Sequence, residues 1–285
     1  MTDLVSTKLR ISHRDGVATV TIDNPPVNVL DVRLMGEIRG FLASVREDTQ
    51  TRVIVFESAD PEFFIAHVDM TLGDQPHALE ELMRDVPEGL NPFQAFSEIL
   101  RSQPQVTIVK LAGLARGGGA EFVAAVDMAF AAEGRAGLAQ CEALMGITPG
   151  GGATQYLDQR MTRGRALEVI LGADLFDAST AERYGWVNRA LPTDELDAFV
   201  DTLARNIAAL PEGVTAAAKA ALPPADLREG FLRENGAWAG LAFRPETQKL
   251  MMGGLKAGAQ TKEGERGLEG LLRGMGAQVG RERTV

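Results

Sequence analysis

The chain has 285 residues, long enough for one large domain or for a core domain with a smaller appendage. Apolar residues make up 45%, so a sizeable buried core can form, and the charged share of 24% is ordinary for a soluble protein. The formal net charge of −10 argues against a nucleic-acid backbone or an anionic membrane as the main partner.

The cysteine and histidine content and the N-terminal sequence bear on compartment and metal binding. Cys141 is the only cysteine, so no internal disulfide can form, and we expect a reducing compartment. The first residues lack the apolar core of a secretory signal, and no segment has the roughly 18 apolar residues of a membrane helix. The lack of both segments predicts a cytoplasmic protein. His13, His67 and His77 are not at ligand spacing, so we predict no metal.

The N-terminal segment predicts a β-hairpin followed by a helix. Residues Leu9 to His13 and Val17 to Ile22 alternate between apolar and polar, and Asp15-Gly16 between them is a turn signal. Asp31 is a suitable N-cap for the next helix. The apolar residues of that helix recur at helical spacing: Leu34, Ile38, Phe41, Leu42 and Val45.

The middle of the chain alternates between short apolar strands and helical patterns, which predicts an α/β region of repeated strand–strand–helix units. A helical stretch from about 78 to 102, interrupted near Pro87 and Pro92, separates the first two of these strands. We expect strands at Val53–Phe56, Thr107–Leu111 and Met128–Ala131, a helix at Gly118–Val126 and one or two helices at Ala153–Leu171.

The pattern changes after Pro192, where no convincing strand follows. An amphipathic stripe runs from Leu196 to Ile207, and the segment from about 223 to 285 is helical but rich in glycine. We therefore divide the chain into an α/β core at 1–200 and a helical region at 201–285. Several apolar residues of that region either form a subunit contact or pack on the core: Phe231, Leu232, Trp238, Leu241 and Phe243.

The most informative segment is KLAGLARGGGAEFVAAVD at 110–127, in which a strand runs through three glycines into a helix. Glycines at such a place allow close backbone approach and leave the N–H groups of the first helical turn unpaired. These N–H groups can hold a phosphate or a developing oxyanion. A P-loop is excluded because no Lys-Ser/Thr follows, and the glycine spacing is wrong for a dinucleotide-binding fingerprint. A tight turn alone explains one glycine well but three in a row poorly.

Four ordered segments resemble the motifs of the crotonase (enoyl-CoA hydratase/isomerase) superfamily. GLARGGGAEF at 113–122 resembles its G-x-A-x-G-G-G-x-E-[LF] segment. NPPVNVLD at 24–31 and EFFIAHVDM at 62–70 resemble two upstream motifs, and AQCEALMGITPGGGATQYL at 139–157 resembles a downstream one. The match covers roughly residues 9 to 200, and four motifs in the right order make coincidence remote.

This resemblance implies a spiral of repeated ββα units, an acyl-coenzyme A thioester as substrate, and no tightly bound cofactor. It places the thioester oxygen between the backbone N–H groups of Val68 and Gly118, which stabilise the enolate character that develops there. It also implies a homotrimer or a dimer of trimers. The other substrate- and coenzyme-binding positions carried over are Pro26, Val27, Ala66, His67, Asp69, Met70, Leu114, Gly117, Cys141 and Gly150.

Two glutamates carry the expected chemistry. Glu121 lies in the first turn of the glycine-turn helix, and Glu142, 21 residues later, matches the family's second glutamate. Two such carboxyl groups can hold a water, add it across an α,β-unsaturated thioester and protonate the α-carbon, provided that burial raises a pKa. The simpler alternatives are that Glu121 only complements the helix dipole and that Glu142 is a surface residue.

Three positions depart from the family pattern. His67 stands where the family usually has glycine, and its ring either points into the acyl site or faces away. Cys141 stands where proline is common, and we expect a small core residue. Arg116, before the glycines, either pairs with Asp69 or another acid or is an ordinary surface charge.

The leading hypothesis is an enoyl-CoA hydratase-like lyase, because isomerases of the family typically keep one working acid. The alternatives are isomerisation, decarboxylation or thioester hydrolysis at the same oxyanion hole. A third alternative, from a different class, is a non-catalytic acyl-CoA-binding or assembly subunit, which the altered His67 position motivates.

Overall fold

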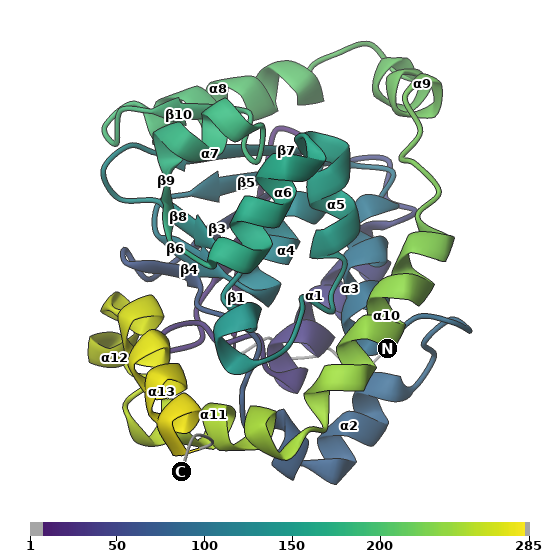
Figure 1. Ribbon diagram of the computed structural model, residues 1–285. Helices are drawn as coiled ribbons and strands as arrows, with labels where there is room; N and C mark the ends of the chain where they lie inside the picture. The colour runs from purple at the N-terminus through teal and green to yellow at the C-terminus, as the bar shows by residue number, and fades with distance from the viewer. Residues whose placement is uncertain (1–7, 283–285) are drawn as a thin grey trace.

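The computed structural model describes residues 8–282 and contains two β-sheets wrapped by helices (Figure 1). The larger sheet has the strand order β1-β2-β3-β5-β7-β10. β1 and β2 form the predicted antiparallel hairpin, with Arg14 opposite Val17, and the other pairings of this sheet are parallel. Its strands are β1 (Leu9–Arg14), β2 (Val17–Ile22), β3 (Val53–Ser58), β5 (Val106–Leu111), β7 (Met128–Ala132) and β10 (Arg189–Leu191).

The smaller sheet, of order β4-β6-β8-β9, consists of very short strands. Its members are β4 (Phe63–Ile65), β6 (Leu114–Arg116), β8 (Gly137–Ala139) and β9 (Phe176–Asp177). β4, β6 and β8 each follow a strand of the larger sheet directly, so the chain passes from one sheet to the other and then into a helix. The repeated pairs β3–β4, β5–β6 and β7–β8 give the expected spiral of ββα units.

Helix starts follow local capping chemistry. Asp31 caps α1 (Val32–Val45) by accepting from Leu34 N at 2.8 Å, as predicted. The helical stretch before β5 is divided as the prolines indicated, into α2 (Pro76–Met83) and α3 (Pro92–Arg101). Asn91 and Gln94 form a capping box at the start of α3.

The helix of the glycine turn, α4 (Gly118–Ala125), is buried on all sides, which fits its content of small and apolar residues. Phe122 projects from it into a cluster of aromatic rings, with its centroid 5.0 Å from Phe56, 5.8 Å from Phe64 and 6.0 Å from Phe96. This packing holds α4 between both sheets and so fixes the position of its first turn.

Three α-helices lie between β8 and β10, after a short helical turn at Glu142–Met145. They are α5 (Ala153–Arg160), α6 (Arg163–Leu167) and α7 (Ala178–Tyr184), with a π-helical turn at Glu168–Gly172. Of the one or two helices expected at Ala153–Leu171, the structure has two, α5 and α6, followed by the π-helical turn. Thr162 lies between α5 and α6 with extended backbone, which ends one helix before the next begins.

After β10, the described chain is helical to its end. α8 (Leu196–Ala208) spans the expected boundary near 200 and packs on the larger sheet. The rest comprises α9 (Val214–Ala221), α10 (Arg228–Ala242), α11 (Pro245–Lys256), α12 (Lys262–Arg266) and α13 (Leu268–Glu282). In Figure 1, α9 stands apart at the upper right, whereas α11 to α13 gather below the smaller sheet. No helix in residues 8–282 has the length and apolarity needed to cross a membrane.

A second hydrophobic cluster joins these last helices to the core. Cys141, Met145 and Ile147 come from the segment after β8, Ala259 comes from the connection between α11 and α12, and Leu272 comes from α13. Trp238 and Leu241 pack on the same cluster, and Phe231 belongs to the main core. Of the residues offered as core or subunit contacts, Leu232 and Phe243 remain exposed.

Candidate active site

The glycine turn brings the start of α4 unusually close to the β4 segment. Gly117 has φ +47°, which glycine adopts without strain, and Gly118 opens the helix. A Cβ on Gly118 would lie 2.5 Å from Val68 Cγ2, and one on Gly119 would lie 2.2 Å from Ile65 O. The consecutive glycines are therefore required because no side chain fits between α4 and the segment it contacts.

The loop after β4 is fixed by a single parallel bridge to Leu30. Leu30 N donates to His67 O at 2.8 Å, and Asp69 N donates to Leu30 O at 3.2 Å. The N–H of Val68, between these two bonds, takes no part in the bridge. The N–H of Gly118 lies in the first turn of α4, where no preceding helical carbonyl can accept it. Both residues line one cavity, so the structure brings the two predicted oxyanion donors together.

This cavity has a volume of about 260 Å³ and is mostly apolar. Its walls come from the loop after β4 (His67–Met70), which we name the oxyanion loop, from the start of α4, from the segment after β8, and from helices α10 and α11. The apolar residues around it include Met70, Leu72, Phe93, Met145, Ile147, Trp238, Met251, Met252 and Leu255. Glu121 and Glu142 are the two glutamates among its lining residues.

Glu121 is almost fully buried on α4 and points toward the turn before α5. Its Oε1 accepts from Gly151 N at 2.7 Å and from Ala153 N at 3.1 Å. Burial raises its pKa well above the ordinary value, and repulsion from Glu142 and Glu234 adds to this, while the two backbone bonds oppose it. The carboxyl group is thus fixed in orientation, and its second oxygen, Oε2, makes neither of these bonds.

Glu142 begins the short helical turn at Glu142–Met145 and is 7% exposed, so it is not a surface residue. Burial raises its pKa to about 7. The Gln140 side-chain amide, with its nitrogen turned toward the carboxyl group, lies 3.1 Å from both oxygens. A Cβ on Gly117 would lie 3.0 Å from Glu142 Oε1, so this oxygen sits directly against the glycine turn.

A third buried glutamate, Glu234 of α10, was not predicted from the sequence. Its Oε1 accepts from Gly152 N at 2.7 Å and from Gln94 Nε2 at 3.0 Å, and Oε2 accepts from both N and Oγ1 of Thr154. Burial raises its pKa. Asn91 Nδ2 donates to Gly150 O at 2.6 Å in the same region. Glu234 therefore fixes the turn before α5, and that turn fixes Glu121. In the sequence, nothing distinguishes Glu234 from the other glutamates in helices.

His67 is buried in the oxyanion loop, and its ring reaches the C-terminal region instead of facing solvent. Its Nε2 lies 2.9 Å from Glu265 Oε1 of α12. Arg116 is fully buried and pairs with Glu269 at 2.6 Å, so the surface-charge interpretation of Arg116 is wrong. The predicted partner Asp69 accepts instead from Thr71 N at 2.9 Å.

The remaining predicted binding residues fall into two groups. Asp69, Met70, Gly117, Cys141 and Gly150 line the cavity together with His67. Cys141 is buried, as expected, and burial raises the pKa of its thiol, which keeps the group protonated.

Four predicted binding residues do not line the cavity. Val27, Ala66 and Leu114 form a small apolar cluster with Phe63, and Pro26 is exposed in the preceding turn. Ala66 N donates to Val27 O at 3.2 Å, so these residues tie the 24–31 segment to the oxyanion loop.

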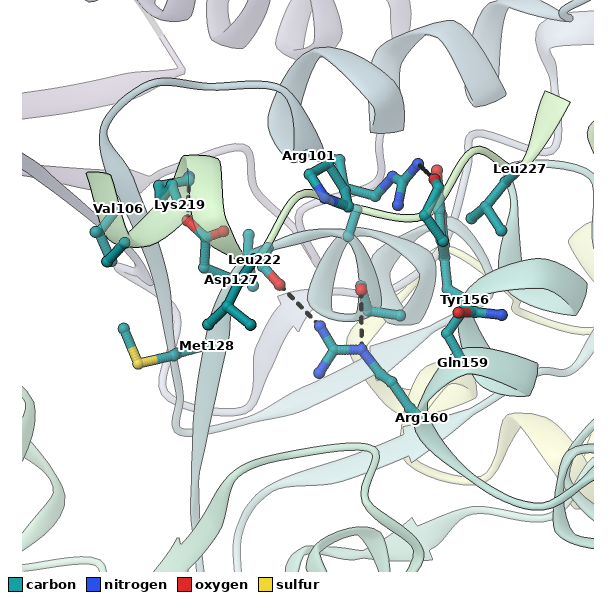
Figure 2. A pocket seen from close by; sticks show the side chains of 16 residues that line it. Arg101, Val106, Asp127, Met128, Tyr156, Gln159, Arg160, Lys219, Leu222 and Leu227 are labelled. Atoms are coloured by element: carbon teal, nitrogen blue, oxygen red, sulfur yellow. Dashed lines mark hydrogen bonds and ion pairs between the residues drawn. The ribbon is translucent and has the colours of Figure 1, made fainter. Parts of the chain in front are cut away.

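A second cavity, of about 490 Å³, lies at the C-terminal end of α4 and contains none of the predicted site residues (Figure 2). Arg160 donates there to the carbonyls of Ala124 at 3.1 Å and Val126 at 2.8 Å, and so caps the last turn of α4. Lys219 pairs with Asp127 at 2.6 Å beside it. These charges have structural partners, so the smaller cavity at the other end of α4 is the candidate active site.

Comparison with known proteins identifies the family and supports the fold. The family model for enoyl-CoA hydratase/isomerase matches residues 12–229. Carnitinyl-CoA dehydratase from Proteus mirabilis is 28% identical over 204 residues, which cover 72% of this chain and 76% of that protein. A candidate enoyl-CoA hydratase from Streptomyces avermitilis has a crystal structure with TM-score 0.94 at 62% identity, covering 95% of this chain and 99% of that one. An enoyl-CoA hydratase from Bacillus anthracis gives TM-score 0.68 at 27% identity, with 88% and 95% covered. The chain is thus a member of the enoyl-CoA hydratase/isomerase family, with the crotonase fold.

Proposed function

We propose that this enzyme adds water reversibly to an α,β-unsaturated acyl-coenzyme A thioester. The observation that carries the proposal is the meeting of Glu121 and Glu142, both buried and both with raised pKa, in the cavity lined by Val68 and Gly118. An isomerase of this family typically needs one working acid, so the presence of two favours hydration.

The reaction follows from the placement of these groups. The thioester oxygen lies between Val68 N–H and Gly118 N–H, and a water lies between the two carboxyl groups. The ionised member of the pair takes a proton from the water while the oxygen of the water bonds to the β-carbon, and the π electrons move toward the thioester oxygen. The two N–H groups stabilise that negative charge. The member of the pair that was protonated at the start then delivers its proton to the α-carbon.

Shared burial explains how the two carboxyl groups have different protonation states near neutral pH. Two carboxylates in one apolar cavity repel each other, so the pair retains one proton over a pH range in which isolated glutamates are both ionised. Gly151 and Ala153 hold Glu121, and Gln140 lies beside Glu142, so each group keeps its orientation through the transfer.

The lining of the cavity supports an acyl group that is mainly apolar. Met70, Leu72, Met145, Ile147 and Trp238 surround the space beyond the two glutamates. The name carnitinyl-CoA dehydratase, borne by relatives at 28% identity, supports the chemistry because dehydration is the reverse of water addition. Coenzyme A enters as part of the substrate, and we propose a homotrimer or dimer of trimers in the cytoplasm.

The test is the reversible loss of the absorbance of an unsaturated thioester, measured with a panel of enoyl-CoA substrates of increasing chain length. We expect the 3-hydroxyacyl-CoA as product, identified by mass from the gain of one water. A shifted double bond would instead indicate isomerisation, a loss of carbon dioxide would indicate decarboxylation, and free coenzyme A would indicate thioester hydrolysis. Tight binding measured by calorimetry without turnover would identify a non-catalytic binder.

A further inference from the structure

The oxyanion loop, His67–Met70, is held on one side by Leu30 and on the other by a segment almost 200 residues away in sequence. That segment begins at Gln260, after α11, and ends at Glu265 within α12, and we name Gln260 and Glu265 the C-terminal clamp. The clamp contacts three of the four loop residues, on both sides of Val68.

Gln260 bonds to the loop through both atoms of its side-chain amide. Its Oε1 accepts from Met70 N at 2.7 Å, and its Nε2 donates to Asp69 Oδ1 at 3.2 Å. Gln260 has φ +67°, a conformation that a non-glycine residue adopts only at a cost. A glycine would relieve that backbone strain, so the presence of glutamine points to a role of its side chain.

Glu265 reaches the loop through His67. Its Oε1 accepts from Gln260 N at 2.8 Å and lies 2.9 Å from His67 Nε2, while His67 Nδ1 lies 2.7 Å from Val68 O. A carbonyl and a carboxylate can only accept, so both ring nitrogens must donate and the ring is an imidazolium. The pKa of His67 is raised by Glu265 against the opposing effect of burial, in agreement with the geometry.

The surrounding charges balance this cation. Arg116 Nη1 lies 3.7 Å from Glu265 Oε2, and the guanidinium bonds to Glu269 of α13. Two cations and two carboxylates thus lie together between the loop and the C-terminal helices, and only Glu269 among them is partly exposed. Such a cluster tolerates the loss of one member poorly, so the loop geometry depends on the clamp.

We propose that Gln260 and Glu265 are positioning residues for the oxyanion hole. They fix the loop so that the Val68 N–H stays aimed at the thioester oxygen, and Glu265 keeps His67 protonated and bonded to Val68 O. The C-terminal region thereby completes the reaction site, in a chain whose family usually has glycine at position 67. This inference rests on the proposed thioester site.

The variants Gln260→Gly and Glu265→Gln test the proposal in the full-length enzyme. Gln260→Gly removes the side chain and the backbone strain together, so a side chain without any role predicts equal or higher thermal stability and unchanged kinetics, and a purely structural role predicts lower stability and unchanged kinetics. We expect instead that each variant lowers kcat about tenfold or more with little change in KM, because a displaced donor weakens transition-state binding.

The matched control is Arg266→Gln, which breaks another link between α12 and the core. Arg266 pairs with Glu62 at 2.7 Å and has no bond to the oxyanion loop, so kcat should stay within about twofold of the wild type. Melting curves of all variants show whether any loss reflects unfolding.

Hydrogen exchange at the peptide containing residues 67–70 is the readout that does not need activity. We expect faster exchange there in Gln260→Gly and Glu265→Gln than in the control. Wild-type kinetics and wild-type exchange in both variants would overturn the clamp. Absence of thioester turnover in the wild type would instead contradict the proposed function. The exchange rates at residues 67–70 would then still test whether Gln260 and Glu265 fix the loop.

Discussion

At the residue scale, burial determines what the candidate acids can do. Glu121 and Glu142 have their pKa raised chiefly by desolvation, and each is held by partners that limit its motion. Exposed glutamates at the same positions would both be ionised at neutral pH and would have no proton to deliver to carbon.

Replacing either acid by its amide should remove the proton transfer while keeping the shape. We expect Glu121→Gln and Glu142→Gln each to lower kcat for hydration by roughly 10²–10⁴, the range for a positioned acid or base. Glu212→Gln, at an exposed position, is the matched control. Steady-state assays with one enoyl-CoA decide the matter, and full activity in both variants would exclude the two-acid mechanism.

The raised pKa of Glu142 should also appear in stability. Its pKa in the folded protein is about 7 and its ordinary value is 4.5, so the folded state binds the proton more tightly than the unfolded state. The stabilisation from this proton is complete below about pH 4.5 and is lost as the pH rises through 7. Denaturant unfolding of the wild type and Glu142→Gln from pH 5 to 8 should show the wild type losing stability relative to the variant. A constant difference would contradict the assignment.

At the element scale, α4 links the core to the chemistry. Its aromatic contacts lie on Phe122, and its first turn supplies Gly118 and Glu121. The helix is therefore positioned by packing, and the glycines permit its start to approach Val68.

A side chain at the start of α4 should disrupt the oxyanion hole. A Cβ on Gly118 would lie 2.5 Å from Val68 Cγ2, so Gly118→Ala must displace the loop or the helix. We expect a loss of kcat of about 10²-fold or more, in line with the loss of one oxyanion donor. Gly164→Ala in α6, where nothing lies within 4 Å, should keep activity and melt at the same or a higher temperature. Equal kinetics of the two variants would refute this role of the close approach.

The turn before α5 depends on α10 through Glu234. Glu234→Gln replaces an acceptor of the Thr154 and Gly152 N–H groups by an amide that can accept through one atom only. We expect weaker fixing of Gly151 and Glu121, a lower melting temperature and a several-fold fall in kcat. The change should also lower the pKa of Glu121, because one repelling charge is gone. An unchanged pH–rate profile together with an unchanged melting temperature would show that Glu234 is dispensable.

At the scale of the whole molecule, the C-terminal helices do two things. They enclose the acyl cavity through Trp238 and Met251, and they carry exposed apolar groups, of which Phe243 is 78% exposed. Leu222, between α9 and α10, is 81% exposed. Large apolar side chains in such positions are typical of surfaces that a further chain covers.

The family resemblance implies a trimer or a dimer of trimers, so sedimentation equilibrium should give a mass of three or six chains, each of 30.5 kDa. The substitution Phe243→Asp, at an exposed apolar position, should weaken association if this face is a subunit contact. A purified wild type that sediments as a monomer at micromolar concentration would overturn the oligomer prediction.

Local patterns in the sequence were sufficient for much of the fold. The hairpin at Asp15-Gly16, the Asp31 cap and the apolar strands all depend on neighbours a few residues apart, and all appear as expected. The three-residue strands of the smaller sheet escaped prediction because they are too short to show a period. The family motifs pointed to the glycine turn and to Glu121 and Glu142, which lie near it in the sequence.

The sequence by itself determined that an N–H-rich glycine turn and two glutamates belong together, because their spacing and motif context are local. Only the tertiary structure decided which other residues support them. Glu234, Gln260 and Glu265 act across separations of 80 to almost 200 residues, and nothing in their own segments distinguishes them from surface side chains. Their roles arise from burial and from hydrogen-bond partners, which exist only once the C-terminal helices have packed against the core.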